Sequence, residues 1–504
     1  MSSIRCIKII VLLAMMPSLS ATAHGFHKAE AVKTAIDNVT VIDAINGLRE
    51  NQTIVFQGDE ILSVGISGNE EVEQRIDGTG KYVIPGLWDM HVHLTAVDLF
   101  GDSMLPLMLS YGVTSVRDTG AMLEKLLPLL EASQAGDIPV QRVYFSGPLL
   151  DGKFIVYDGS GLFRPSTGMA NTIPEHADST VAKLKQSGAS FIKIYEMVDP
   201  EVFHALVDAA EKHDLPIAAH VPLSTRTSEV GGRLDSMEHL RNVLIDCTTD
   251  AAEQLQVRRK MLKNEKELLG GDLRAEIHRD QRVKAMLNLD QEQCDRTIQA
   301  LLGTIQVPTL SLGNRFGGTL GERQDWLEAV GRLPEPARSV WHDIGTAPGR
   351  SPAGYRVDFA EAQKELVKRM YQAGITFGAG TDIPIPPSVP GHSLHLELEA
   401  LVAAGLSPLD AIGAATLAPA VFFSVEREMG SIDAGKRADM LMLTDNPLDD
   451  IRHTQNIHAV IIQGQLIGQE GIGELALISQ QGSFKLDALG WLYKMATGMG
   501  FSLF

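Results

Sequence analysis

The sequence predicts an α/β protein: a (β/α)₈ TIM-like barrel with a small β-sandwich domain built from both chain ends. From about residue 83, short apolar runs rich in Val, Ile and Phe alternate with amphipathic stretches. Such alternation is typical of a parallel sheet covered by helices on both faces. The 504 residues are enough for one large barrel with additions. Short strands separated by turn residues occur before and after this region and predict the second, smaller domain.

The barrel prediction depends on eight strand candidates that follow one another along the chain. They are residues 87–94, 113–118, 141–147, 190–196, 216–222, 236–240, 306–312 and 375–382. The stretch 249–303, between the sixth and seventh candidates, is charged and helical, and we expect it to be an insertion in the barrel. In barrels of this type, insertions after the strands cover the C-terminal face, where active sites lie.

The domain boundaries follow from where the strand pattern changes. We expect the barrel over residues 83–424 and the small β domain over residues 30–82 and 425–475. In the first part of the small domain, QTIVFQGDEILSVG alternates as a half-buried strand pair does. The tail, residues 476–504, is apolar and is predicted to be helical.

The first 23 residues have the pattern of a signal peptide. Arg5 and Lys8 precede the apolar run 9–16, and Ala21-Thr22-Ala23 is a small-x-small cleavage site. We therefore expect an exported protein, periplasmic or secreted. The apolar run is too short for a membrane span, so no stable span is expected after cleavage.

Charge and cysteine content limit the partners. The formal net charge of −19 makes nucleic acid an unsuitable partner, and a small-molecule substrate is expected instead. Cys247 and Cys294 remain after cleavage at residue 23. In an exported protein they can form a disulfide, but the sequence leaves their pairing open, as it does the formation of a homo-oligomer.

The first strand candidate ends with two histidines. In a strand, residues i and i+2 point to one face, so His91 and His93 share a face. Two adjacent imidazoles can bind one divalent metal ion. A single HxH pair fits a structural role almost as well, so this motif needs support from others.

A lysine lies inside the apolar fourth candidate, FIKIY. Lys193 and Tyr195 share one face of this strand. A buried ammonium without a partner is costly and tends to lose its proton, and a neutral amine can react with carbon dioxide to form a carbamate. Pairing with an acid or extension to the rim are the structural alternatives for Lys193. Tyr195 either contacts the substrate or packs at the rim.

Three more candidates end in metal-competent side chains. His220 ends the fifth, His239 the sixth, and Asp382 the eighth, after two glycines that allow close backbone approach. Each alone fits a structural role. Together with the histidine pair and the lysine they gather at the end of a barrel where active sites lie, which favours a metal site.

The second candidate ends in Arg117 and Asp118. Neighbouring opposite charges at a strand end suit either an ion pair or a substrate clamp. We expect a structural ion pair between them.

These motifs, in this order, resemble the amidohydrolase superfamily. Its landmarks match VIPGLWDMHVHL, GVTSVRDTG, AGTDI, AATLAPA and GSIDAGKRADMLMLTDNPL, and the resemblance covers residues 34–467. The chain is similar to the binuclear, carboxylated-lysine type, in the imidazolonepropionase-related, Xaa-Pro dipeptidase-like branch. That branch often has Gly-Gly-His-Gly where this chain reads FSGPLLDGK. Leu223 stands where related deaminases carry glutamate, which disfavours a deaminase.

The resemblance implies two divalent metal ions, usually zinc, and a carbamate on Lys193. The implied ligands are His91, His93, Lys193, His220, His239 and Asp382. A hydroxide that bridges the metals would attack the substrate carbonyl, with Asp382 as general base and then general acid. We expect an exported amidohydrolase that cleaves amide-type C–N bonds of dipeptides or N-acyl amino acids. A lactonase or ester hydrolase, and a non-catalytic scaffold on the same fold, are the alternatives.

Overall fold

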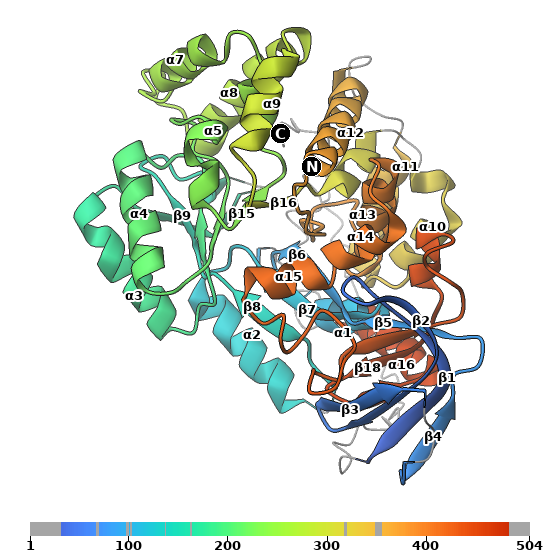
Figure 1. Cartoon of the computed structure of the whole chain (residues 1–504). Helices are drawn as coiled ribbons and strands as arrows, with labels where there is room; N and C mark the ends of the chain where they lie inside the picture. Colours follow the sequence, from blue (N-terminus) through green and yellow to red (C-terminus); the bar gives the residue numbers. More distant parts are fainter. Residues whose placement is uncertain are drawn as a thin grey trace, which may run out of the picture.

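The computed structural model describes residues 32–66, 70–96, 100, 103–136, 138–161, 164–316, 320–347 and 355–482 (Figure 1). The predicted signal peptide, 1–23, lies outside these residues, as does most of the predicted helical tail. The described start of that tail is helical, because α16 (Gln469–Gln481) runs across the predicted boundary at residue 475.

Strands from both chain ends form one mixed sheet of eight strands. β1 pairs with β2 on one side and with β4 and β5 on the other, and β5 pairs with β17. The second half of the chain thus completes the sheet that the first half begins. Its two-layered form, a sandwich, stays a prediction. The strands are β1 (Thr34–Asp43), β2 (Gly47–Gln57), β3 (Glu60–Gly65), β4 (Gln74–Asp77), β5 (Tyr82–Pro85), β17 (Met440–Leu443), β18 (Ile457–Ile462) and β19 (Gln465–Ile467).

Between these two parts the chain forms parallel sheets, as the strand–helix alternation predicts. One has the order β6-β7-β8 and the other β12-β9-β13-β14-β15-β16. The short β10 (Asp158–Gly161) and β11 (Arg164–Ser166) form a hairpin beside them. The parallel strands are β6 (Leu87–Val92), β7 (Val113–Asp118), β8 (Arg142–Phe145), β9 (Leu149–Asp151), β12 (Gly168–Ala170), β13 (Ile192–Ile194), β14 (Ile217–Ala219), β15 (Ser236–Glu238) and β16 (Ile305–Val307).

The eighth strand candidate links the two parallel sheets. It forms isolated parallel bridges, Gln306 with Phe377 and Val92 with Ile383, in place of a full strand. A Cβ at Gly380 would lie 2.7 Å from both the His91 Cβ and the Val307 Cγ1. Glycine is therefore required for this segment to fit between β16 and β6. The result is a TIM-barrel-like α/β fold, although the parallel strands that the structure describes do not form one continuous closed sheet.

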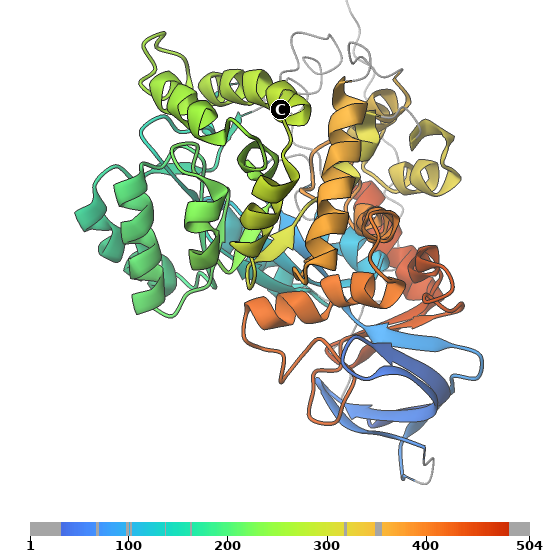
Figure 2. The same ribbon diagram turned by 45° about the horizontal axis from the view of Figure 1, so that its top comes forward.

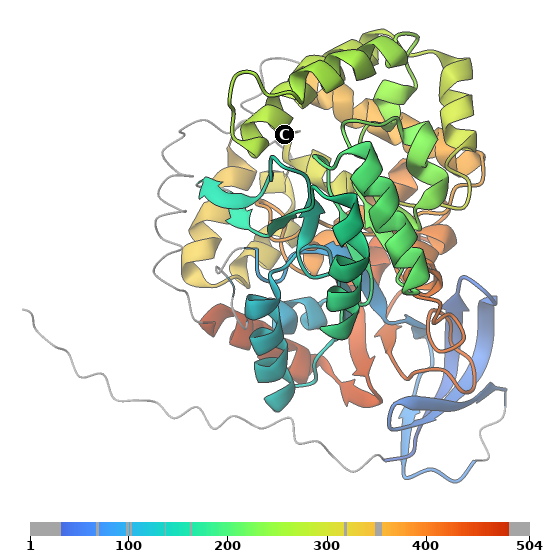
Figure 3. The ribbon, with the colours of Figure 1, turned by 90° about the vertical axis from the view of Figure 1, so that its left-hand side faces the viewer.

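Helices cover the parallel strands, and the predicted insertion projects at the end away from the small sheet (Figures 1, 2 and 3). The insertion holds α7, α8 and α9. The helices are α1 (Met104–Ser110), α2 (Leu123–Ala135), α3 (Ala177–Gln186), α4 (Pro200–Lys212), α5 (Thr227–Val230), α6 (Val243–Asp246), α7 (Ala251–Met261), α8 (Gly270–Leu287), α9 (Gln291–Gln299), α10 (Gln324–Gly331), α11 (Glu335–Thr346), α12 (Tyr355–Gln372), α13 (His392–Ala403), α14 (Pro408–Ala414), α15 (Leu417–Phe422) and α16. Across the part of the chain that the structure describes, no helix combines the length and apolar composition of a membrane span.

Candidate metal centre

The ends of the parallel strands bring the predicted ligands together. His91 lies in β6 and Lys193 in β13, while His220 and His239 directly follow β14 and β15. Asp382 follows the segment that bridges β16 and β6, and its backbone N–H donates to the His91 carbonyl at 2.7 Å. Parallel pairing places these ends at one edge of the sheets, which is why side chains far apart in sequence meet there.

Asp382 lies at the centre of the cluster. Its Oδ1 is 3.1 Å from His93 Nε2 and 3.4 Å from His91 Nε2, and its Oδ2 is 3.7 Å from His239 Nε2. One potential ligand atom from each of His91, His239 and Asp382 lies within 4.8 Å of the other two. The His220 ring joins them through His239, at 4.8 Å between ring centroids.

Each of the four imidazoles has its Nδ1 occupied by an oxygen. The partners are Glu238 for His91 at 2.5 Å, the Gly120 carbonyl for His93 at 3.4 Å, Glu196 for His220 at 2.7 Å, and Thr309 for His239 at 2.6 Å. The Thr309 hydroxyl donates to the Pro308 carbonyl, so it accepts a hydrogen bond from the Nδ1–H of His239. Such oxygens fix the tautomer and leave Nε2 as the ligand atom.

The electrostatics favour the neutral form of three of the four imidazoles, beside an ionised carboxylate. Burial lowers the pKa of His91 to about 4. For His220 and His239, burial and the positive charges of Lys193 and Arg241 lower the pKa values well below the usual range. Burial would also lower the pKa of His93, but Asp382 raises it overall. Although burial opposes it, His91 and His93 hold the pKa of Asp382 below its usual value. Neutral histidine and ionised aspartate are the forms that bind metal.

Lys193 is buried, with 1% of its surface exposed. Burial lowers its pKa to about 8. Its Nζ lies 3.5 Å from Glu238 Oε1 but donates no hydrogen bond to any residue within the described ranges. A buried amine without a hydrogen bond is uncommon in folded proteins. Imidazole nitrogens and carboxylate oxygens around it are the donor set that zinc accepts, so these residues fit a metal site.

Helix α8 of the insertion contacts the cluster through Glu196, a residue that follows β13. Both oxygens of this buried carboxylate accept from α8: Arg274 donates two hydrogen bonds of 3.0 Å and His278 one of 2.6 Å. Although burial would raise the pKa of Glu196, Arg274 and His278 hold it well below its usual range. Glu196 is thus fixed as an anion beside His220.

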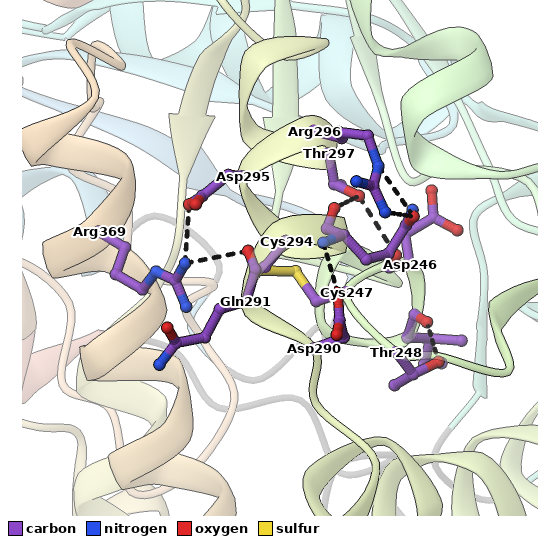
Figure 4. Close-up of a disulfide and its surroundings, with 12 residues drawn as sticks. Asp246, Cys247, Thr248, Asp290, Gln291, Cys294, Asp295, Arg296, Thr297 and Arg369 are labelled. Carbon is purple, nitrogen blue, oxygen red and sulfur yellow. Dashed lines mark hydrogen bonds and ion pairs between the residues drawn. A yellow bond between two sulfur atoms is a disulfide. The ribbon is translucent and has the colours of Figure 1, made fainter.

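A disulfide ties the insertion to helix α6, which follows β15 and His239 in the chain. Cys247, at the end of α6, is bonded to Cys294 of α9, 47 residues later (Figure 4). The backbone N–H of Asp290 donates to the Cys247 carbonyl at 2.9 Å, and Arg369 of α12 pairs with Asp295 at 2.7 Å. The pairing that the sequence left open is therefore present.

Tyr195, the predicted substrate contact, is buried. Its ring lies 4.4 Å from the His220 ring and 5.7 Å from the Tyr157 ring, centroid to centroid, and Arg274 lies over it at 5.8 Å. These contacts hold the His220 ring in place, which favours the packing role over direct substrate contact.

The backbone is strained at the same edge. His239 has φ 58° and Asp382 has φ 59°, in the left-handed region that non-glycine residues rarely adopt. Strain of this kind costs about 1–3 kcal/mol per residue and is concentrated at functional sites.

The predicted ion pair between Arg117 and Asp118 is wrong. Neighbouring strand residues point to opposite faces, so Arg117 pairs with Glu238 at 2.8 Å, while Asp118 accepts from the backbone of Leu94 and Gly120. The sequence interpretation also missed the residues that orient the ligands. These are Glu196, Glu238, Arg274, His278 and Thr309.

Comparison with known proteins identifies the family. The model of the amidohydrolase family matches residues 82–242 and 356–467, which is more than half of the chain. The chain belongs to the amidohydrolase family. This membership confirms the resemblance and supports a hydrolase that acts on carbon–nitrogen bonds.

Individual members of the family share only part of their sequence with this chain. Ochratoxinase from Aspergillus niger is 33% identical over 119 residues, 23% of this chain and 24% of that protein. The chain thus matches about a quarter of the length of this curated relative. Among solved structures, a Xaa-Pro dipeptidase with bound methionine has a TM-score of 0.59 at 21% identity, covering 86% of this chain and 100% of that one. Bottromycin amidohydrolase has a TM-score of 0.63 at 20% identity, covering 88% of both chains. These structures support the fold.

Proposed function

We propose that this amidohydrolase is a metal-dependent enzyme that hydrolyses amide-type C–N bonds of dipeptides or N-acyl amino acids. One observation carries the proposal: three imidazoles, each with Nδ1 bound to an oxygen, direct Nε2 toward one ionised aspartate, and the ring of a fourth, His220, packs against one of them. This arrangement prepares metal ligands and has little structural purpose otherwise. The names of the similar structures, a Xaa-Pro dipeptidase and an amidohydrolase, support the bond type.

His91, His93 and Asp382 would hold one divalent ion, and His220 and His239 the second, with carboxylated Lys193 shared between them. The resemblance implies that these ions are zinc. When bound, they would act as Lewis acids and lower the pKa of a bound water. The fit rests on the Lys193 amine, which donates no hydrogen bond within the described residues, and on the lowered pKa values of His91, His220 and His239.

The residues of the chain would move the proton. Asp382 is ionised, so its carboxylate can accept a proton from the attacking water. The same carboxyl group can then donate that proton to the leaving nitrogen, which makes it base and then acid.

Closure of the barrel and export belong to the same proposal. The bridges of residues 375–383 on both sides support a complete eight-stranded barrel. The Cys247–Cys294 disulfide supports an oxidising compartment, periplasmic or extracellular, because cytosolic thiols stay reduced.

The test is a substrate panel with zinc-loaded protein and the Asp382→Asn variant. We expect cleavage of dipeptides or N-acyl amino acids, and a decrease in kcat of about 10²–10⁴-fold in the variant, because a general base is lost. Asp208→Asn, at an exposed carboxylate on α4, is the matched control. Cleavage of lactones alone would establish the ester hydrolase instead. A metal-loaded protein that cleaves none of these compounds would favour the scaffold.

A further inference from the structure

Arg258, on helix α7 of the insertion, is a buried cation without a hydrogen-bond partner among the described residues. None of its surface is exposed, and none of its three guanidinium nitrogens donates to a residue of the described ranges. Arginine is almost never fully buried unless it is paired, and buried polar groups are nearly always hydrogen-bonded. Arg258 therefore requires a partner that the described part of the chain does not supply.

The two carboxylates whose charges act most strongly on Arg258 are those of Asp246 and Glu196, and both are bound by other groups. Asp246, on α6, pairs with Arg226 at 3.0 Å and accepts from the backbone N–H of Ser228 at 2.9 Å. Glu196 accepts from side chains of α8 at both of its oxygens. Neither carboxylate is thus available to neutralise Arg258.

The buried face of α7 that carries Arg258 supplies no counter-charge either. Its other buried members are uncharged: Ala251, Gln254 and Leu255. The Gln254 amide donates to Asp250 at 2.8 Å, so it is directed toward the start of the helix, away from Arg258. The next residue, Arg259, adds a second positive charge and donates to the Ser224 carbonyl at 3.0 Å. Positive charge is therefore in excess on this side of α7.

The guanidinium of Arg258 keeps its charge in spite of this environment. Burial lowers its pKa to about 10, so the group is still protonated at neutral pH. A buried charge without compensation is costly. Water can accept hydrogen bonds from a guanidinium but leaves its charge in place, whereas an anion accepts the hydrogen bonds and also neutralises the charge. Because the side chain is fully enclosed, the site suits a small anion and not a large organic one.

We propose that Arg258 binds a small monovalent anion of the size of chloride, enclosed where α7 packs against α6 and α8. The guanidinium carries five N–H donors in a rigid plane, so several of them can point at one anion. The bound anion holds α7 in the insertion by removing an uncompensated charge from its buried face. This site is separate from the proposed metal centre, and the metal-free chain tests it, so either proposal can fail without the other.

The direct experiment is anomalous diffraction from crystals soaked in sodium bromide, because bromide replaces chloride and can be located by its scattering. We expect one strong anomalous peak beside the Arg258 guanidinium. Peaks on exposed surfaces alone would mean an adventitious ion only, and that result would overturn the proposal. Ordered water beside Arg258 in the bromide-soaked crystal would overturn it as well.

Thermal unfolding of the metal-free protein in sodium chloride and in sodium gluconate tests the same site in solution. At equal concentration both salts screen surface charges to the same extent, but gluconate is too large to be enclosed. We expect chloride to raise the Tm of the wild type by about 2–4 °C relative to gluconate, because a ligand that binds only the folded state stabilises it. Arg258→Met removes the charge and keeps a long apolar side chain, so it should lose this difference.

Arg259→Met is the matched control, because this neighbouring arginine is exposed, and the variant should keep the chloride effect. An equal chloride response in Arg258→Met and the wild type would contradict the proposal, as would no response in the wild type. If Arg258→Met does not fold, Arg258→Lys takes its place. It keeps the charge and loses the planar fork, so its chloride response should be smaller than that of the wild type, and an unchanged response would contradict the site.

Discussion

Two buried glutamates, Glu238 and Glu196, orient ligand histidines in the same manner but are completed by different parts of the chain. Each accepts a hydrogen bond from a histidine Nδ1 and is held as an anion by an arginine. For Glu238 that arginine is Arg117, on strand β7, which pairs with the strand β6 that carries His91. For Glu196 it is Arg274, on helix α8 of the insertion. The comparison indicates that His91 is positioned by the barrel alone, whereas His220 depends on an added segment.

The largest effect is expected when the barrel glutamate loses its charge. Glu238→Gln leaves the buried Arg117 and Lys193 without their shared anion. Breaking a buried pair in this way costs about 3–5 kcal/mol, which chemical unfolding of the metal-free protein would measure. Glu428→Gln, in an exposed pair with Arg437, should cost at most about 1 kcal/mol. Similar values for the two variants would show that Glu238 is not an essential part of the barrel.

The next largest effect concerns the anchoring of the insertion. Replacing Cys247 and Cys294 by serine opens a loop of 47 residues, and the loss of such a cross-link costs about 2–4 kcal/mol of unfolding free energy. Because the insertion carries Arg274 and His278, we also expect weaker metal binding at His220. Unchanged stability in the double variant, measured against the oxidised wild type, would contradict the anchoring role.

A smaller and more local effect, on metal affinity, is expected when one side chain of the insertion is replaced. Arg274→Met removes the two hydrogen bonds to Glu196 and should lower metal affinity about 10–100-fold, as changes to groups that orient metal ligands do. Competition with a chelator measures this loss, which should affect one of the two ions. Arg279→Met, an exposed residue of the same helix, is the control. An equal loss in both variants would mean that the insertion does not support His220.

The smallest effect, on the pH dependence of stability, concerns a third buried glutamate, whose carboxyl group accepts hydrogen bonds from backbone N–H groups. Glu397 accepts from the N–H groups of Leu310 and Ser311, and burial raises its pKa from 4.5 to about 7. The folded protein therefore keeps a proton that the unfolded chain loses, so stability from Glu397 decreases as pH rises from about 4.5 to 7.

Comparison with Glu397→Gln isolates this contribution. In metal-free protein, the advantage of the wild type over the variant should shrink by about 1 kcal/mol between pH 5 and pH 6. Glu238 and Glu196, whose pKa values are lowered, should show the opposite sign, with stability lost as pH falls. An advantage that grows with pH would mean that Glu397 is ionised in the folded state.

The ligands could be predicted from the sequence because a strand period and a strand end are local properties. His91 and His93 share a face by their spacing alone, and His220, His239 and Asp382 follow recognisable apolar runs. The eighth run, however, forms only bridges, because its close fit between β16 and β6 depends on neighbours that the sequence does not place.

The orienting residues could not be predicted in the same way. Arg274 and His278 are four residues apart, which places them on one face of a helix. That spacing was a usable signal, but the carboxylate they bind lies nearly eighty residues earlier. Glu196 and Glu238 directly adjoin site residues, yet only the fold shows that they face a histidine and an arginine.

The most direct test of the central claim is the metal content of the purified, zinc-loaded protein, with Lys193→Ala beside the wild type. Elemental analysis should find about two divalent ions per chain in the wild type. The Lys193→Ala variant should hold less metal and regain it with an added short carboxylic acid. Full occupancy of the untreated variant would exclude the carbamate, and a wild type that retains no metal would contradict the metal centre itself.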